Sequence, residues 1–144
     1  MITKVLNILK PKLRDIKVTT LFQPLPLVLA DSGQMQQVIM NILTNSIQAI
    51  QDMGEIVIKT KASMGYVEIS ISDNGCGIPK ENINKIFDPF FTTKAPGEGT
   101  GLGLYICYGI VQRHNGCIDV KSEIGNGTTI TIKLPRRHGE DFSY

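Results

Sequence analysis

Several features are scarce or absent in this sequence, and each narrows the class of protein to which it can belong. The chain of 144 residues has three cysteines, an odd number without metal-ligand spacing, which argues against a disulfide scaffold and favours a reducing cytoplasm. Its longest apolar run, residues 25–30, is far shorter than the roughly 20 residues that span a bilayer. No signal-peptide pattern opens it. Histidine occurs twice, which limits the chemistry that the chain can perform alone.

Net charge is also low, because 15 Lys and Arg residues nearly balance 13 Asp and Glu residues and leave +2. Proteins that bind nucleic acid or anionic membranes by releasing counterions need a larger positive charge. We therefore expect no nucleic-acid partner and no membrane contact by this domain. A chain of this length buries roughly 68% of its unfolded surface, enough for one independently folding domain.

Hydrophobic periodicity predicts an α+β fold, a two-layer sandwich in which helices cover one face of a mixed sheet. Asp31 is an expected N-cap, and Asn115-Gly116 an expected helix stop. The predicted elements are a helix over 2–10 ending before Pro11, edge strands over 18–22 and 25–30, a helix over 31–50, a hairpin of 55–62 and 66–73, a long loop over 74–103, a helix from 104, and a hairpin of 117–122 and 128–134.

The long helix carries a polar stripe in which Asn41 and Asn45 lie one turn apart, flanked by Gln37 and Gln48. A solvated helix face is one interpretation of this stripe. However, the helix has no Lys, Glu or Arg, and Asn is a mediocre helix former. Amide oxygens on one helix face also suit a hard cation such as Mg²⁺ that carries phosphate oxygens.

Asp73 continues the apolar phase of its predicted strand, after Val67, Ile69 and Ile71. A carboxylate pointing to the core side needs hydrogen-bond donors. It either caps the following turn or accepts a hydrogen bond from a ligand amine such as that of adenine. The glycines that follow within the next four residues favour the ligand, because they let backbone approach a flat molecule closely.

The predicted loop over 74–103 holds six of the 14 glycines, and the second cluster precedes a helix. Successive amide groups at a helix N-terminus suit a phosphate, although glycine-rich turns often precede helices without binding anything. Lys94 could reach a terminal phosphate or be a solvated surface residue. Phe87, Phe90 and Phe91 either anchor the loop to the core or contact a partner.

Four motifs in series resemble the catalytic ATP-binding domain of two-component sensor histidine kinases, within the wider gyrase, Hsp90, histidine kinase and MutL group. Residues 37–45 (QVIMNILTN) resemble the N box and residues 73–78 (DNGCGI) the first glycine box. Residues 87–94 (FDPFFTTK) resemble the F box and residues 99–104 (GTGLGL) the second glycine box. The resemblance covers residues 18–135, and the amino-acid sequences of its motifs are most similar to those of the nitrogen-sensor branch.

This resemblance implies the Bergerat ATP-binding fold, a mixed and mostly antiparallel sheet under three helices. It implies that Asn45 is the Mg²⁺ ligand, that Asn41 lies on the phosphate side, and that Asp73 accepts from the adenine amine. Asn41, Asn45 and Lys94 are the residues expected to serve catalysis. The other expected nucleotide-site residues are Gly75, Gly77, Ile78, Phe87, Thr92, Thr93, Gly99, Thr100, Gly101, Leu102, Gly103 and Leu104, with residues 74–103 as the ATP lid.

The resemblance further implies transfer of the γ-phosphate of Mg-ATP to a histidine on a separate dimerisation domain of the same kinase. Phe90 and Phe91 are the candidates for contacting that domain, and a response regulator would act downstream. Residues 1–14 are interpreted as the remnant of a helix and linker from the dimerisation domain, residues 15–137 as the catalytic domain, and residues 138–144 as a tail. We expect the isolated domain to be monomeric and cytoplasmic.

Two departures from the family pattern stand out. Gln48 occupies a position where many relatives carry Lys or Arg, so a phosphate contact from this helix is less expected. The family's phosphorylated histidine is usually followed by an acidic residue, whereas Asn115 follows His114 and Gly139 follows His138. The chain therefore has the ATP side of the reaction without its acceptor. The alternatives are a nucleotide-binding switch that transfers nothing and a related serine kinase or ATPase of the same group.

Overall fold

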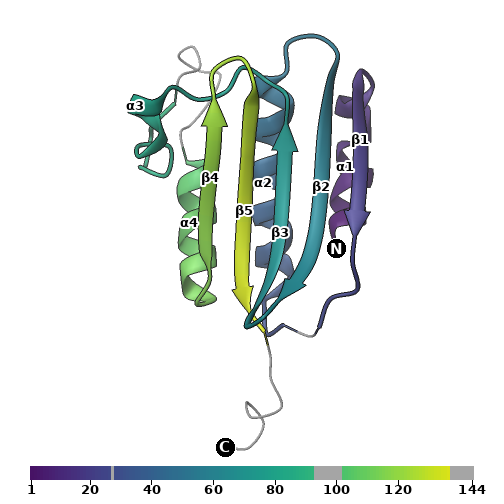
Figure 1. The fold of residues 1–144 in the computed structure, drawn as a ribbon, viewed down its shortest axis with the longest axis vertical. Helices are drawn as coiled ribbons and strands as arrows, with labels where there is room; N and C mark the ends of the chain where they lie inside the picture. The colour runs from purple at the N-terminus through teal and green to yellow at the C-terminus, as the bar shows by residue number, and fades with distance from the viewer. Residues whose placement is uncertain (27, 93–101, 137–144) are drawn as a thin grey trace, which may run out of the picture.

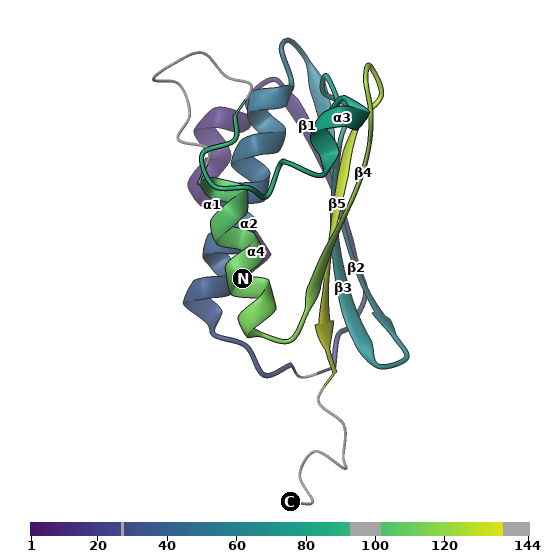
Figure 2. The ribbon, with the colours of Figure 1, turned by 90° about the vertical axis from the view of Figure 1, so that its left-hand side faces the viewer.

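The computed structural model describes residues 1–26, 28–92 and 102–136, which form two layers (Figure 1). Figure 2 shows α1, α2 and α4 on one face of the sheet, while the other face carries no helix in the described part of the chain. A further short helix lies beside one end of the sheet. The predicted α+β sandwich of three helices on a mixed sheet is confirmed. The helices are α1 (Ile2–Leu9), α2 (Ser32–Ala49), α3 (Lys80–Ile83) and α4 (Gly103–Arg113), with a 3₁₀ turn at Lys10–Leu13.

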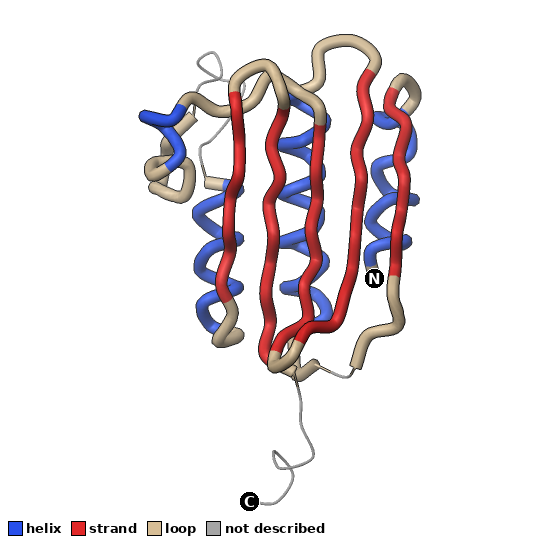
Figure 3. The backbone as a smooth tube through the Cα atoms, viewed as in Figure 1, coloured by secondary structure: helices blue, strands red, loops and turns tan. Residues whose placement is uncertain are grey.

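Among the described residues, the sheet has five strands in the order β1-β2-β3-β5-β4, as labelled in Figure 1, and Figure 3 shows them side by side in red. β1 and β2 run parallel, and every other neighbouring pair is antiparallel. The last strand of the chain thus lies between β3 and β4 rather than at an edge. The strands are β1 (Ile16–Phe22), β2 (Gly54–Ser63), β3 (Tyr66–Asp73), β4 (Cys117–Glu123) and β5 (Gly127–Pro135).

Local sequence explains where the helices begin and end. The Asp31 side chain caps α2 by accepting a hydrogen bond from the Gln34 N–H at 2.8 Å, as predicted. Pro11 follows the end of α1 and lies in the first turn of the 3₁₀ segment. Asn115 adopts a positive φ of 59° just beyond α4, which reverses the chain toward β4.

The core lies between the helix layer and the covered face of the sheet. Both α2 and α4 place their apolar sides on it, and α1 contributes to the same cluster. Strands β2, β3 and β5 supply alternate residues, which is the pattern of a sheet buried on one face. The fully buried large side chains include Ile39, Ile42, Leu43, Ile56, Ile58, Ile71, Ile110 and Ile132.

Two expectations about regular structure were wrong. The predicted strand over 25–30 is absent from its described residues, which connect β1 to α2 without regular structure. Pro24 and Pro26 have no N–H to donate to a sheet, which accounts for the difference. The long loop contains α3, which begins after Pro79. Within the described ranges, none of the helices is long and apolar enough to cross a membrane.

Candidate nucleotide-binding site

Asp73 ends β3 with its carboxylate half-buried and surrounded by donors. Its Oδ1 accepts a hydrogen bond from the Gly75 N–H at 2.9 Å. The Ser46 hydroxyl on α2 and the Thr128 N–H on β5 donate to the same carboxylate. Burial raises the pKa of the Asp73 carboxyl above its usual 3.8, and the three donors oppose that rise. The prediction that the Asp73 side chain points to the core side of the sheet is confirmed.

The glycines after Asp73 are required by close backbone contacts. A Cβ at Gly75 would lie 2.6 Å from the Ala49 carbonyl oxygen, at the end of α2. Gly77 has a positive φ of 78°, and a Cβ there would collide with the Glu123 carbonyl oxygen. The Cys76 N–H donates to Ala49 O at 3.1 Å. The segment is therefore held between the end of α2 and the turn that joins β4 to β5.

The two asparagines of the N box lie on the side of α2 that meets α4. Asn41 donates through Nδ2 to the Gly103 carbonyl oxygen at 3.2 Å, while Asn45 lies half-buried one turn later. Beneath them, burial raises the pKa of the Cys107 thiol to about 12, and its Sγ donates to Val38 O at 3.6 Å. The structure thus brings the N box to Gly103, the first residue of α4 and a member of the second glycine box.

Metal binding here would depend on neutral oxygens. Among the described residues, no group of three or more His, Cys, Asp or Glu side chains is placed to hold a metal ion. The amide oxygen of Asn45 is a hard ligand, which fits a Mg²⁺ ion that already carries phosphate oxygens. Gln48 is exposed, one turn further along α2.

The F-box segment is anchored by residues of different kinds. The ring centroids of Phe87 and Tyr108 lie 5.7 Å apart at an interplanar angle of 36°. Ile86, which the sequence patterns did not single out, is the buried anchor of this segment. Phe91 is half-buried, whereas Phe90 is 72% exposed and has a positive φ of 67°. Of the two earlier alternatives for the aromatic residues, Phe87 fits the anchor and Phe90 fits a contact surface.

Several predicted site residues lie outside the described residues, namely Thr93, Lys94, Gly99, Thr100 and Gly101. The described ones lie on α2, at the end of β3, in the segment that follows β3, and at the start of α4. Ile78 follows the first glycine box, and its N–H donates to the Ser122 hydroxyl at 2.7 Å. Thr92, Leu102 and Leu104 flank the undescribed stretch.

Sequence reasoning missed three hydroxyl residues at this end of the sheet. Ser46 is buried on α2 and donates to Asp73. Thr128 and Ser122 occupy the core-facing phases of β5 and β4, where apolar residues precede or follow them. A polar residue in an apolar strand phase is the signal that identified Asp73, and the same test applied to β4 and β5 would have found both.

Both ring nitrogens of His114 contact backbone groups. Its Nε2 accepts a hydrogen bond from the Asp31 N–H at 3.0 Å, and Nδ1 lies 2.8 Å from the Ile110 carbonyl oxygen. The Nδ1–H tautomer satisfies both contacts. His114 therefore closes α4, as predicted, and joins it to the start of α2. His138 lies outside the described residues.

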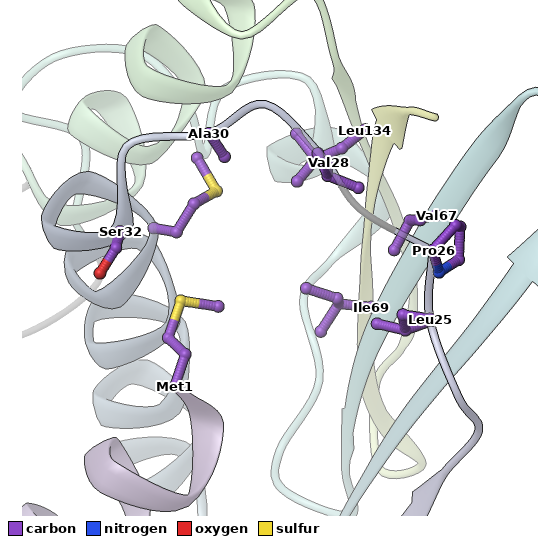
Figure 4. Close-up of a pocket in the computed structure, with 10 residues that line it drawn as sticks. Met1, Leu25, Pro26, Val28, Ala30, Ser32, Val67, Ile69 and Leu134 are labelled. Atoms are coloured by element: carbon purple, nitrogen blue, oxygen red, sulfur yellow. The ribbon is translucent and has the colours of Figure 1, made fainter. Parts of the chain in front are cut away.

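A pocket of about 240 Å³ lies at the other end of the sheet from Asp73 (Figure 4). It opens between the N-terminus of α1, the connection before α2, and the ends of β3 and β5. Its lining is almost entirely apolar, with Ser32 as the polar residue among those that line it. The lining residues are Met1, Leu25, Pro26, Val28, Ala30, Ser32, Met35, Val67, Ile69 and Leu134.

The profile of the family described as "Histidine kinase-, DNA gyrase B-, and HSP90-like ATPase" matches residues 30–138. The chain belongs to this family. Among its relatives, the sensor histidine kinase ZraS of Escherichia coli K12 is 45% identical over 111 residues, which cover 77% of this chain and 23% of ZraS. The signal transduction histidine-protein kinase AtoS of the same strain is 50% identical over 107 residues, which cover 74% of this chain and 17% of AtoS.

Solved structures of histidine kinases share the fold of this ATPase-family domain. The catalytic domain of histidine kinase ThkA has a TM-score of 0.83 at 34% identity, covering 94% of this chain and 90% of that one. The mycobacterial sensor histidine kinase MprB has a TM-score of 0.84 at 28% identity, covering 95% and 93%. A complex of ThkA with the response regulator TrrA gives 0.79 at 31% identity, covering 94% and 39%.

These likenesses confirm the resemblance seen in the four motifs. In sequence and fold, the chain corresponds to the ATP-binding catalytic domain of sensor histidine kinases. It spans less than a quarter of the length of ZraS and of AtoS. The relatives are thus much longer proteins, of which this domain is one part.

Proposed function

We propose that this histidine kinase domain binds Mg-ATP and presents the γ-phosphate to a histidine of a separate dimerisation domain. The proposal rests mainly on Asp73, a half-buried carboxylate at the end of β3 that accepts hydrogen bonds from several donors. The glycine segment that follows it packs against Ala49. A carboxylate held this way can accept a hydrogen bond from the exocyclic amine of adenine. Gly75 and Gly77 let the segment after Asp73 pack closely against the Ala49 and Glu123 backbone, which holds that segment beside the carboxylate.

The domain's contribution to catalysis is positioning and charge neutralisation, because phosphoryl transfer needs little covalent chemistry from the protein. Asn45 would hold the Mg²⁺ ion, which neutralises phosphate charge. Asn41 fixes the beginning of α4 through the Gly103 carbonyl and borders the phosphate side. Lys94 and the second glycine box, which includes Gly101 and Gly103, would complete the phosphate contacts.

We predict that Asn45→Ala reduces Mg²⁺-dependent phosphotransfer by about 100-fold or more, because loss of a metal ligand costs several kcal/mol of charge stabilisation. The wild-type chain is first titrated with Mg-ATP by calorimetry. It is then mixed with the histidine-bearing domain of a similar sensor kinase and radiolabelled ATP, and acid-labile phosphate on that domain is counted.

The same assay separates the alternatives. ATP binding without transfer to the histidine domain would favour a nucleotide-binding switch, and transfer to serine would favour a related serine kinase. Ser32→Ala, exposed in the first turn of the same helix, is the control and should leave transfer unchanged. Full transfer by Asn45→Ala would contradict the metal assignment.

We place the contact with the dimerisation domain at Phe90 and Phe91. Phe90 is the stronger candidate, because a large apolar side chain that is 72% exposed in a positive-φ conformation contributes little to folding. The partners are that dimerisation domain and a response regulator downstream, and the reaction belongs in the cytoplasm. A monomeric catalytic domain suits such a transient contact.

We predict that Phe90→Ser lowers phosphotransfer to the histidine-bearing domain by about tenfold, the effect of losing about 1.4 kcal/mol of contact energy. ATP affinity and thermal stability should change little. The assay is transfer rate against acceptor concentration, with Met64→Ser as control because Met64 is 95% exposed in the β2–β3 turn. An unchanged rate at low acceptor concentration would remove Phe90 from the interface.

A further inference from the structure

Three polar side chains form one row across the end of the sheet. In the strand register Asp73 on β3 pairs with Thr128 on β5, and Thr128 pairs with Ser122 on β4. All three occupy the core-facing phase, where the rest of each strand is apolar. Thr128 is buried and the other two are half-buried. The polar row thus replaces the apolar core at this end of the sheet.

Ser122 is the member of the row farthest from Asp73, and its hydroxyl has three partners. The Ile78 N–H donates to Ser122 Oγ at 2.7 Å. Thr128 Oγ1 lies 2.7 Å from the same oxygen, and the Gly127 carbonyl oxygen lies at 3.0 Å. A serine hydroxyl has one hydrogen and two lone pairs, so these three contacts use its full capacity.

The turn between β4 and β5 supports the first glycine box at further points. The Gly125 N–H donates to the Cys76 carbonyl oxygen at 2.9 Å. Gly77 packs against the backbone of Glu123 with no space for a Cβ. A Cβ at Gly127 would likewise collide with the Asp73 carbonyl oxygen. The first glycine box therefore packs on this turn. The Ser122 hydroxyl adds a hydrogen bond, which it accepts from the Ile78 N–H at the end of the box.

Ser122 also constrains the hydroxyl of Thr128. When Ser122 donates its single hydrogen to Gly127 O, the Thr128 hydroxyl donates to Ser122 and keeps its lone pairs for other partners. When Ser122 donates to Thr128 instead, the Thr128 hydrogen is available to an acceptor such as a ring nitrogen. The Thr128 backbone N–H donates to Asp73 in either case. Ser122 therefore affects the surroundings of Asp73 at two points, through the Thr128 hydroxyl and through the Ile78 N–H.

From this geometry we infer that Ser122 is a positioning residue for the nucleotide base, acting through the Ile78 backbone and the Thr128 hydroxyl. It does not touch the nucleotide itself. The inference rests on the proposed ATP site, because it assigns to Ser122 the placement of the segment that borders the adenine. Its effect should appear in nucleotide affinity and not in the rate of transfer from bound ATP.

The test compares Ser122→Ala with Ser72→Ala in the full chain. Ser72 Oγ lies 2.7 Å from Thr129 Oγ1, so the control loses an equally short hydroxyl pair between neighbouring strands on the opposite face. Calorimetry should show about a tenfold loss of affinity for both ATP and ADP in Ser122→Ala, since an unsatisfied buried N–H costs about 1.4 kcal/mol or more. Ser72→Ala should bind both nucleotides like the wild type, and Ser122→Thr should restore affinity.

Two further measurements separate positioning from a loss of folding. Hydrogen exchange at the Ile78 amide should accelerate in Ser122→Ala and stay at the wild-type rate in Ser72→Ala. With saturating ATP, transfer to a histidine-bearing domain should proceed at the wild-type kcat. If Ser122→Ala does not fold, Ser122→Cys gives the same comparison, because a thiol keeps the shape and accepts hydrogen bonds weakly.

Wild-type affinity in Ser122→Ala, or an equal loss in Ser72→Ala, would overturn the inference. So would failure of Ser122→Thr to restore binding while its thermal midpoint matches the wild type. ATP binding by the wild-type chain without transfer to any histidine domain would overturn the proposed function and leave this inference standing. Absence of ATP binding by the wild-type chain would overturn both.

Discussion

Burial and ligand binding place opposite demands on the charge of the Asp73 side chain. Its burial makes the charged form unfavourable in the folded chain, whereas binding of an amine requires that charged form as an acceptor. Gly75, Ser46 and Thr128 donate to it and reduce the cost without removing it. Such residues commonly mark functional sites, because a fold selected for stability alone would place an apolar residue there.

We predict that Asp73→Asn weakens ATP binding at least tenfold, since hydrogen bonds to charged groups contribute about 1.5–3 kcal/mol. The same change should raise the thermal midpoint of the nucleotide-free chain at pH 7, because Asn has the same shape without the buried charge. Calorimetry and thermal unfolding measure the two effects. Asp119→Asn, at an exposed position of β4, is the control and should alter neither.

The pH dependence has a defined sign. Because the folded-state pKa of Asp73 is raised above 3.8, its contribution to stability is present below that value and is lost as pH rises through the folded-state pKa. ATP affinity should fall on acidification at a pH above 3.8, and Asp73→Asn should lack this step. An identical pH profile in wild type and Asp73→Asn would assign the acid sensitivity to another group.

Helix α2 serves the site at one end and the scaffold at the other. Its 18 residues extend about 27 Å. Ala49, at the C-terminal end, contacts Gly75 and Cys76. At the N-terminal end, the Asp31 N–H donates to His114 and so joins α2 to the end of α4. The helix can therefore be perturbed at either end separately.

We predict that His114→Ala lowers the free energy of unfolding by about 1–2 kcal/mol, because it leaves the Asp31 N–H without its partner and removes a contact at the end of α4. ATP affinity should change less than twofold, since the change lies a helix length away from Asp73. Denaturant unfolding and calorimetry measure the two quantities. Gln112→Ala, at an exposed position of the same helix, is the control and should change neither the unfolding free energy nor the ATP affinity. A large loss of ATP affinity in His114→Ala would contradict the separate roles of the two ends of α2.

At the scale of the whole molecule, sequence patterns predicted most of the fold because strand and helix periods were regular. The alternation ending in Asp73 and the Asp31 cap both correspond to observed geometry. The connection over 25–30 was predicted wrongly because its apolar run obscured the effect of its prolines. Ser122 and Thr128 were missed for a different reason. Each is visible as a polar residue in an apolar strand phase, but their position beside Asp73 comes from the register between β3, β5 and β4, which no single strand's pattern contains.

The insertion of β5 between β3 and β4 has a consequence for biosynthesis. As the chain leaves the ribosome, Asp73 emerges first, then Ser122, and Thr128 emerges last. The row that holds the base site together is complete only when the final strand has entered the gap between its neighbours. A chain that lacks β5 also lacks Ile130, Ile132 and Leu134 of the core, so neither the complete sheet nor the polar row can form without this strand. We therefore expect a nascent chain to bind nucleotide only after β5 has been synthesised and has joined the sheet.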